Sequence, residues 1–136
     1  MQQSKLQRDE FIAAARELIG VPWVHMGQTK LGVDCVGLVV YAGKKCGAFP
    51  QDYTIPEYPM GPARTKMLRH LEYICQRTME PKVGDVVVFI KKNLAHVGIL
   101  TEHNNMIHAS QGDKRVLEVP FTSPWADYPH SFWELK

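Results

Sequence analysis

One cysteine in the sequence stands where it could act as a nucleophile. Cys35 follows Asp34, a good N-cap residue, and precedes an apolar run, Val36 to Ala42, that is long enough for a buried helix. A thiol in the first helical turn feels the positive end of the helix dipole, which favours the nucleophilic thiolate. The pattern therefore predicts a reactive thiol, and the alternative is a structural cysteine that fills space in the core.

Two histidines on predicted strands could serve that thiol. His96 and His108 are 12 residues apart (108 − 96 = 12), on either side of a predicted turn at His103 and Asn104. In an antiparallel hairpin such positions can fall side by side on one face. If the helix of Cys35 packs on that face, His96 can act as the base and His108 can orient His96. A strand histidine taken alone is more often a core or surface residue than a catalytic one, and we give that interpretation to the other histidines: His25, His70, His103 and His130.

Helices come first in the chain. Ser4 and Gln7 fit a capping box, and apolar residues then recur at helical spacing as far as Gly20, the expected C-cap. The helix of Cys35 should end near Cys46, with Gly47 at its cap. Its Gly37 predicts close packing against another backbone.

A proline-rich loop should follow from Ala48 to Pro62, and a further helix from Pro62. The buried face of that helix should end at Ile74 or Cys75.

The second half of the chain has the two-residue alternation and the β-branched composition of strands. Short turns join these segments, so the sheet should be a mainly antiparallel meander of about five strands. Helices followed by strands predict an α+β domain, with the helices packed on the sheet. The expected strands are Val86–Ile90, His96–Leu100, Met106–Ala109, Val116–Val119 and Ser131–Leu135.

Length and composition set limits on the function. The 136 residues, 45% of them hydrophobic, suit one domain spanning 1–136, and a net charge of +2 is too small to predict nucleic-acid binding. The three cysteines form no CxxC pair, so the sequence predicts neither a disulfide framework nor a zinc site, and a reducing compartment is expected. No apolar export signal or bilayer-length segment is visible. We therefore expect a protein made in the cytoplasm without a signal peptide and without membrane contact.

Four motifs, in order and at matching spacing, carry a family resemblance over about Phe11 to Val119. With this pattern the sequence resembles the NlpC/P60 family of papain-like cysteine peptidases. The motifs are Gly20-Val21-Pro22-Trp23 with Gly27, Asp34-Cys35-Val36-Gly37-Leu38-Val39, Val83-Gly84-Asp85-Val86-Val87-Val88-Phe89, and His96-Val97-Gly98-Ile99 followed by Ile107-His108-Ala109.

The resemblance implies a thiol protease of papain-like fold. It makes Cys35 the nucleophile, His96 the general base and His108 the orienting residue, and it places Trp23 and Asp34 in contact with substrate. Family members typically hydrolyse amide bonds in the stem peptides of bacterial peptidoglycan. The resemblance implies no cofactor and no metal.

Two positions depart from the family pattern: Val36 replaces a usual Ser, and Trp23 stands where members often have a Tyr. An indole N–H could replace the phenol as an oxyanion donor, so we expect the chemistry to survive and the substrate preference to change. The short chain without export signal or wall-binding repeats is similar to the versions carried by phages and gene transfer agents. We therefore expect a virion protein of a phage-type tail that degrades the cell wall during DNA entry, with tail proteins as partners.

Three other functions stay open at this point. The chain could be a catalytically silent plug or structural protein of a tail, or an NlpC/P60-like amidase or acyltransferase. A metal site built from Cys35, His96 and His108 is disfavoured because the usual closely spaced ligand pairs are missing.

Overall fold

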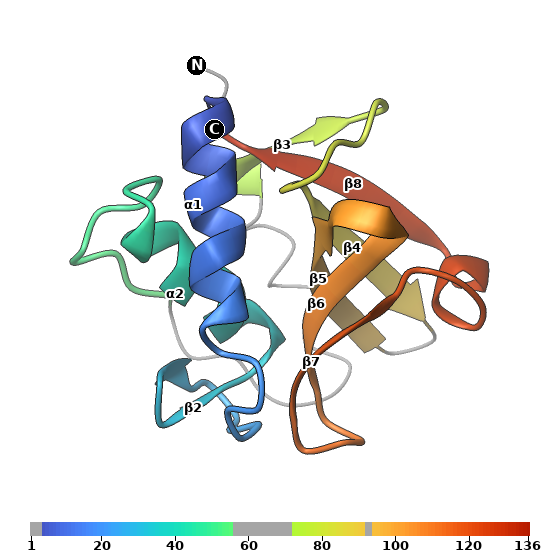
Figure 1. Ribbon diagram of the computed structural model, residues 1–136, viewed down its shortest axis with the longest axis horizontal. Helices are drawn as coiled ribbons and strands as arrows, with labels where there is room; N and C mark the ends of the chain where they lie inside the picture. The colour runs from blue at the N-terminus through green and yellow to red at the C-terminus, as the bar shows by residue number, and fades with distance from the viewer. Residues whose placement is uncertain (1–3, 56–71, 92–93) are drawn as a thin grey trace.

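The computed structural model describes residues 4–55, 72–91 and 94–136. Two helices, α1 (Lys5–Arg16) and α2 (Cys35–Lys45), pack against each other and against an antiparallel sheet (Figure 1). This arrangement confirms the predicted α+β fold. Within the described residues, no helix is long and apolar enough to cross a membrane.

The sheet has six strands in the order β3-β8-β4-β5-β6-β7, and all neighbouring pairs are antiparallel. Strands β4 to β7 form the predicted meander, and β8 returns to pair with β4. The strands are β3 (Cys75–Thr78), β4 (Val86–Lys91), β5 (Leu94–Thr101), β6 (Asn105–Ser110), β7 (Arg115–Pro120) and β8 (His130–Leu135).

The expectation of about five strands is wrong by one, because β3 was missed. Cys75 opens this edge strand and pairs with Leu135 of β8, so it does not mark the buried face of a helix. Gln76 and Arg77 are exposed, and a four-residue strand with one buried side chain lacks a clear alternation. Residues 72–74 before it are helical. The rest of the helix predicted from Pro62, and the second half of the proline-rich loop, lie outside the described residues.

The helix caps largely follow the sequence. The Ser4 side chain accepts a hydrogen bond from the Gln7 N–H at 3.1 Å, but the Gln7 side chain reaches the Cys46 carbonyl and does not complete a capping box. Helix α1 ends at Arg16, earlier than predicted, and Gly20 follows it with φ +89°. Helix α2 ends as predicted, with Cys46 as its C-cap.

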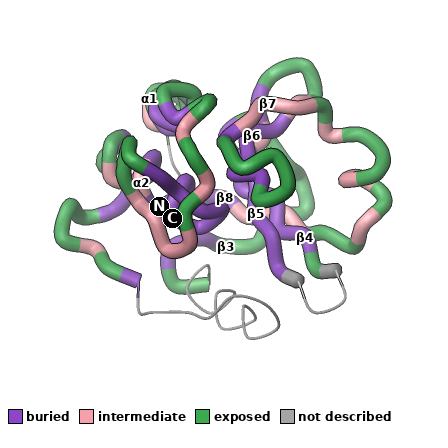
Figure 2. Tube along the Cα trace, turned by 90° about the horizontal axis from the view of Figure 1, so that it is seen from below, coloured by how far each residue is buried: buried purple, intermediate pink, exposed green. Residues whose placement is uncertain are grey.

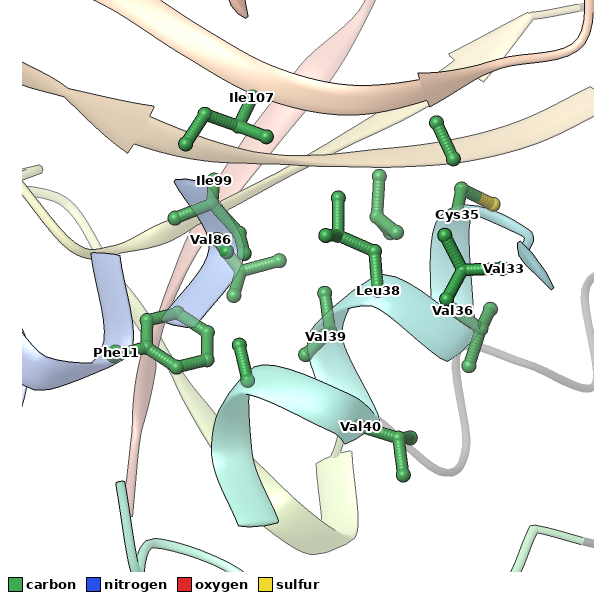
Figure 3. Close-up of a cluster of buried hydrophobic side chains, with 14 of the residues drawn as sticks. Phe11, Val33, Cys35, Val36, Leu38, Val39, Val40, Val86, Ile99 and Ile107 are labelled. Atoms are coloured by element: carbon green, nitrogen blue, oxygen red, sulfur yellow. The ribbon is translucent and has the colours of Figure 1, made fainter. Parts of the chain in front are cut away.

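The main core lies between the helices and one face of the sheet, where buried residues are continuous from α2 into the strands (Figure 2). Leu38 of α2 lies between the helix and the strands, below Ile99 of β5 and Ile107 of β6 (Figure 3). The other face of the sheet carries a second, smaller core centred on Val87, Phe89 and Met106. The sheet is therefore covered on both faces. A side chain of the sheet can reach solvent or a substrate only at an edge or where two strands separate.

Two arginines of α1 tie the helix to the sheet. Arg8 forms ion pairs with Asp85 at 2.6 Å and with Glu134 at 3.4 Å, and both carboxylates are buried. Arg16 pairs with Glu118 of β7 at 3.1 Å and with Glu102 in the short 3₁₀ helix η2 (Glu102–Asn104). The guanidinium of Arg16 lowers the pKa of both carboxyl groups.

Candidate active site

Cys35 is the first residue of α2, and the aspartate before it fixes the start of that helix. The Asp34 carboxylate accepts hydrogen bonds from the Gly37 N–H at 2.7 Å and from the Met26 N–H at 2.8 Å. Asp34 is 1% exposed. The predicted N-cap is therefore confirmed, and the same carboxylate joins α2 to the loop that precedes it. Substrate contact by Asp34 stays a prediction.

A close approach of two backbones holds the same junction. A Cβ on Gly37 would lie 1.7 Å from the carbonyl oxygen of Gly27, so only glycine fits at this position of α2. This confirms the close packing predicted at Gly37. The loop also carries the two-stranded hairpin of β1 (Gln28–Thr29) and β2 (Gly32–Val33).

Trp23 lies on a segment that extends the edge of the sheet. The backbone N–H of Trp23 donates to the Lys114 carbonyl at 2.9 Å, and the Val116 N–H donates to the Val21 carbonyl at 3.0 Å. An isolated bridge joins Trp23 to Val33, two residues before Cys35. Trp23 is thereby fixed between the edge strand β7 and the start of α2.

His96 and His108 meet as the sequence predicts. Nε2 of His96 lies 2.9 Å from Nδ1 of His108, with the rings nearly perpendicular at 88°. The two histidines are only 8% and 2% exposed. One proton fits between two nitrogens at this distance, so one ring donates and the other accepts.

Burial favours the neutral form of His108. Desolvation lowers the pKa of His108 from 6.5 to about 4, against a smaller opposing effect of the Asp113 carboxylate. His108 is therefore neutral near pH 7, and its Nδ1 can accept a hydrogen bond from the Nε2–H of His96.

The residues that flank the two histidines face α2. Ala95, Val97 and Ala109, which flank the two histidines, belong to the main core on the α2 side, together with Cys35. By the alternation of a strand, His96 and His108 point toward the opposite face.

An opening in the sheet nevertheless lies at the histidines. The ladder between β5 and β6 runs from the pair Ile99–Ile107 to the pair Thr101–Asn105, so His96 and His108 lie beyond its end. On its other side, β6 stays paired with β7, where His108 lies opposite Leu117. Helix α2 packs on both β5 and β6, with Cys35 in its first turn close to the strands (Figure 3).

A cleft of about 260 Å³ lies at this opening. Trp23 also packs against the main core, so it borders both the α2 side and the cleft. The cleft is lined by Trp23, His96, His108, Ala109, Ser110, Gln111, Gly112 and Trp125.

Trp125 is a site residue that the sequence analysis did not identify. It lies in the short 3₁₀ helix η3 (Trp125–Asp127), and its ring stacks on His96 with 5.1 Å between centroids and 24° between planes. It follows His96 by 29 residues (125 − 96 = 29), in a loop without periodicity, so no spacing rule connects the two.

All three cysteines are buried, and none of them forms a disulfide. Desolvation raises the pKa of Cys75 to about 12 and also raises the pKa of Cys46. A raised pKa favours the neutral thiol over the thiolate, so Cys46 and Cys75 are suited to packing in the core. Across residues 4–55, 72–91 and 94–136, no group of three His, Cys, Asp or Glu side chains is placed to hold a metal ion.

The comparisons with known proteins agree with this fold. The model of the NlpC/P60 family matches residues 20–134. A search of curated proteins finds no match. Among solved structures, NlpC1 from Trichomonas vaginalis superposes with a TM-score of 0.71 at 18% identity, covering 98% of this chain and 46% of that one. An NlpC/P60 family protein from Bacillus cereus gives 0.67 at 20% identity, covering 96% of this chain and 40% of that one. This chain thus spans less than half of either protein.

Two single-domain structures are covered almost completely. The NlpC/p60 domain of the peptidoglycan hydrolase SagA has a TM-score of 0.62 at 21% identity, covering 95% of this chain and 98% of that one. RipD from Mycobacterium tuberculosis has a TM-score of 0.64 at 16% identity, covering 98% of each chain, and is described as a non-catalytic domain adapted to peptidoglycan binding. At these identities the likeness shows the fold alone, so activity has to be argued from the site.

Proposed function

The chain belongs to the NlpC/P60 family, and from that membership we propose that it is a cysteine peptidase that hydrolyses amide bonds in peptidoglycan stem peptides. The observation that carries the proposal is the 2.9 Å contact between His96 and His108. A buried pair in which one imidazole orients the other is what a thiol nucleophile requires of its base. The pair lies where β5 and β6 stop pairing with each other, and the helix of Cys35 packs against these two strands.

The ring nitrogens of His96 then have separate roles. Nε2 faces His108, so Nδ1 is the nitrogen that takes the proton of the Cys35 thiol. A free thiol with a pKa of about 8.5 is only a few per cent thiolate at pH 7. The helix dipole contributes at most about 2 kcal/mol to the anion, and the His96 imidazolium supplies most of the remaining stabilisation.

In the first half of the reaction, the Cys35 thiolate attacks the amide carbonyl carbon. The carbonyl oxygen becomes an oxyanion, for which the Cys35 N–H and the Trp23 indole N–H are candidate donors. His96 gives its proton to the leaving amine, and a thioester remains on Cys35. His96 then takes a proton from water, and the hydroxide attacks the thioester carbon. This step releases a carboxylic acid and restores the thiol.

The test is digestion of purified peptidoglycan, with mass spectrometry of the released fragments. The wild-type protein should release two products, one with a new carboxyl end and one with a new amino end, whose masses sum to that of the intact stem plus one water. Cys35→Ala and His96→Ala should release none. An added amine acceptor that appears in the product would identify an acyltransferase.

The second candidate is a catalytically silent module that binds peptidoglycan, which is how RipD is described. In that case the wild-type protein and Cys35→Ala would both bind to insoluble peptidoglycan and neither would release fragments. The inward placement of His96 and His108 in one cleft with Trp23 favours the enzyme.

The delivery route that we propose is a phage-type tail, which carries the enzyme to the wall so that it need not diffuse to its substrate. Family resemblance supports this part of the proposal. Mass spectrometry or immunogold labelling of purified particles tests it. Absence of the protein from intact particles, with free activity in lysates, would indicate a role in host lysis or wall maintenance instead.

A further inference from the structure

The indole of Trp125 covers the two histidines on the side of the sheet away from α2. It lies nearly parallel to the His96 ring, with 5.1 Å between centroids and 24° between planes. It meets the His108 ring more steeply, at 70°, again with 5.1 Å between centroids. Beyond the histidines it rests on Phe89, with 5.0 Å between centroids. One side chain therefore contacts both members of the hydrogen-bonded pair.

The backbone that carries Trp125 is tied to the sheet at both ends. The Phe121 N–H donates to the Asn104 carbonyl at 2.8 Å, and the Ile90 N–H donates to the Pro129 carbonyl at 2.9 Å. Between these ties, the Tyr128 N–H donates to the Trp125 carbonyl at 3.1 Å, and the Tyr128 ring meets the indole edge-on. The turn therefore fixes the backbone position of Trp125, and Tyr128 supports its indole.

We propose that Trp125 is a positioning residue, whose indole holds the plane of His96 so that Nε2 faces His108 and keeps water from the hydrogen bond between them. Its effect on cleavage rests on the proposed function. The stacked geometry also places an aromatic face against the ring that becomes an imidazolium, and such a face attracts a cation.

Few other charges act on this pair in the described part of the chain. Asp113, in the turn after β6, raises the pKa of His108 and is outweighed by burial. His130 of β8 lies on the far side of Phe89, with 6.0 Å between ring centroids. In the proposed reaction Cys35 of α2 faces His96. Removing the indole should therefore change the pair mainly by admitting water.

The experiment compares Trp125→Leu and Trp125→Phe with the wild-type protein. Phe121→Leu is the matched control, because Phe121 packs on Phe89, His130 and Phe132 in the same aromatic cluster. Histidine titration by NMR should show the pKa of His108 moving from about 4 toward 6.5 in Trp125→Leu, less in Trp125→Phe, and unchanged in Phe121→Leu. For peptidoglycan cleavage, kcat should fall roughly 2- to 30-fold in Trp125→Leu with KM little changed, since cation–π contacts of about 0.5–2 kcal/mol correspond to that range.

The titration does not depend on activity, so the two proposals can fail separately. If the wild-type protein cleaves nothing while the Trp125→Leu titration shifts, the proposed function fails and the role of Trp125 stands. If the His108 titration is the same in both Trp125 variants and the wild-type protein, the role of Trp125 is wrong. Should the variants not fold, the wild-type protein still decides: the proton between His96 and His108 should exchange slowly with water, and fast exchange would overturn the proposal.

Discussion

His96 and His108 contact each other through Nε2 and Nδ1 at 2.9 Å, just beyond the end of the ladder that joins their strands. At this point β5 and β6 no longer pair with each other, although His96 still pairs with Phe89 of β4 and His108 with Leu117 of β7. The two rings contact each other and aromatic neighbours. In the proposed mechanism, the contact leaves one nitrogen of His96 for the thiol and gives His108 an orienting role. The predictions below depend on this division of roles.

The first prediction concerns substitutions of His108. His108→Asn and His108→Gln should keep measurable cleavage, because an amide oxygen can accept the His96 N–H, whereas His108→Ala should lose more. The double variant His96→Ala/His108→Ala should be little worse than His96→Ala, because the two residues act as a unit. Steady-state rates on peptidoglycan measure this. A folded His108→Ala with wild-type activity would reduce His108 to a structural residue.

The second prediction concerns stability against pH. His108 has a pKa of about 4 in the folded protein and 6.5 when unfolded, so the unfolded chain binds more protons between these values. The contribution of neutral His108 to the free energy of unfolding is therefore fully present above pH 6.5. It decreases by up to about 3 kcal/mol as the pH falls to 4. Urea unfolding at pH 7 and pH 4 measures it. The difference between the wild-type protein and His108→Gln should change by about this amount, because other titrating groups cancel, and an unchanged difference would refute the prediction.

The third prediction concerns the buried ion pairs of Arg8. Arg8→Ala leaves the carboxylates of Asp85 and Glu134 buried without their cation, which should cost about 3–5 kcal/mol of unfolding free energy. Lys5→Ala is the control, because Lys5 pairs with Asp9 in water, with side chains 91% and 57% exposed. That change should cost less than about 0.5 kcal/mol. Equal losses in the two variants would contradict this account of α1.

The fourth prediction concerns the backbone contact at the start of α2. A methyl group on Gly37 would overlap the Gly27 carbonyl, so Gly37→Ala must move α2 away from the loop that carries Trp23. We expect a loss of at least about 2 kcal/mol in stability together with reduced cleavage. Gly112→Ala, where nothing lies within 4 Å, should leave the stability within about 0.5 kcal/mol. Urea unfolding of both variants compares them.

Local sequence signals predicted the local structure well. The Asp34 cap, the end of α2 at Cys46 and the alternating strands follow from capping and periodicity, which act within a few residues. The pairing of His96 with His108 was predictable because a short hairpin joins their strands.

Features set by long-range packing were not predictable. Edge strand β3 is held by β8, whose paired residues come 54 (132 − 78) to 60 (135 − 75) positions later, and the exposed Gln76 and Arg77 give no strand signal of their own. Trp125 reaches the histidines through a turn without a periodic pattern.

Alkylation of Cys35 at mildly acidic pH tests the central claim most directly. With iodoacetamide at pH 5.5 and peptide mapping by mass spectrometry, the wild-type protein should be modified stoichiometrically at Cys35. The buried Cys46 and Cys75 should stay unmodified because burial raises the pKa of both thiols. His96→Ala should lose the modification, since in the proposed mechanism the imidazolium supplies most of the stabilisation of the thiolate. Modification of Cys35 no faster than Cys46 and Cys75, or equally fast without His96, would contradict the assignment of a thiolate–imidazolium pair.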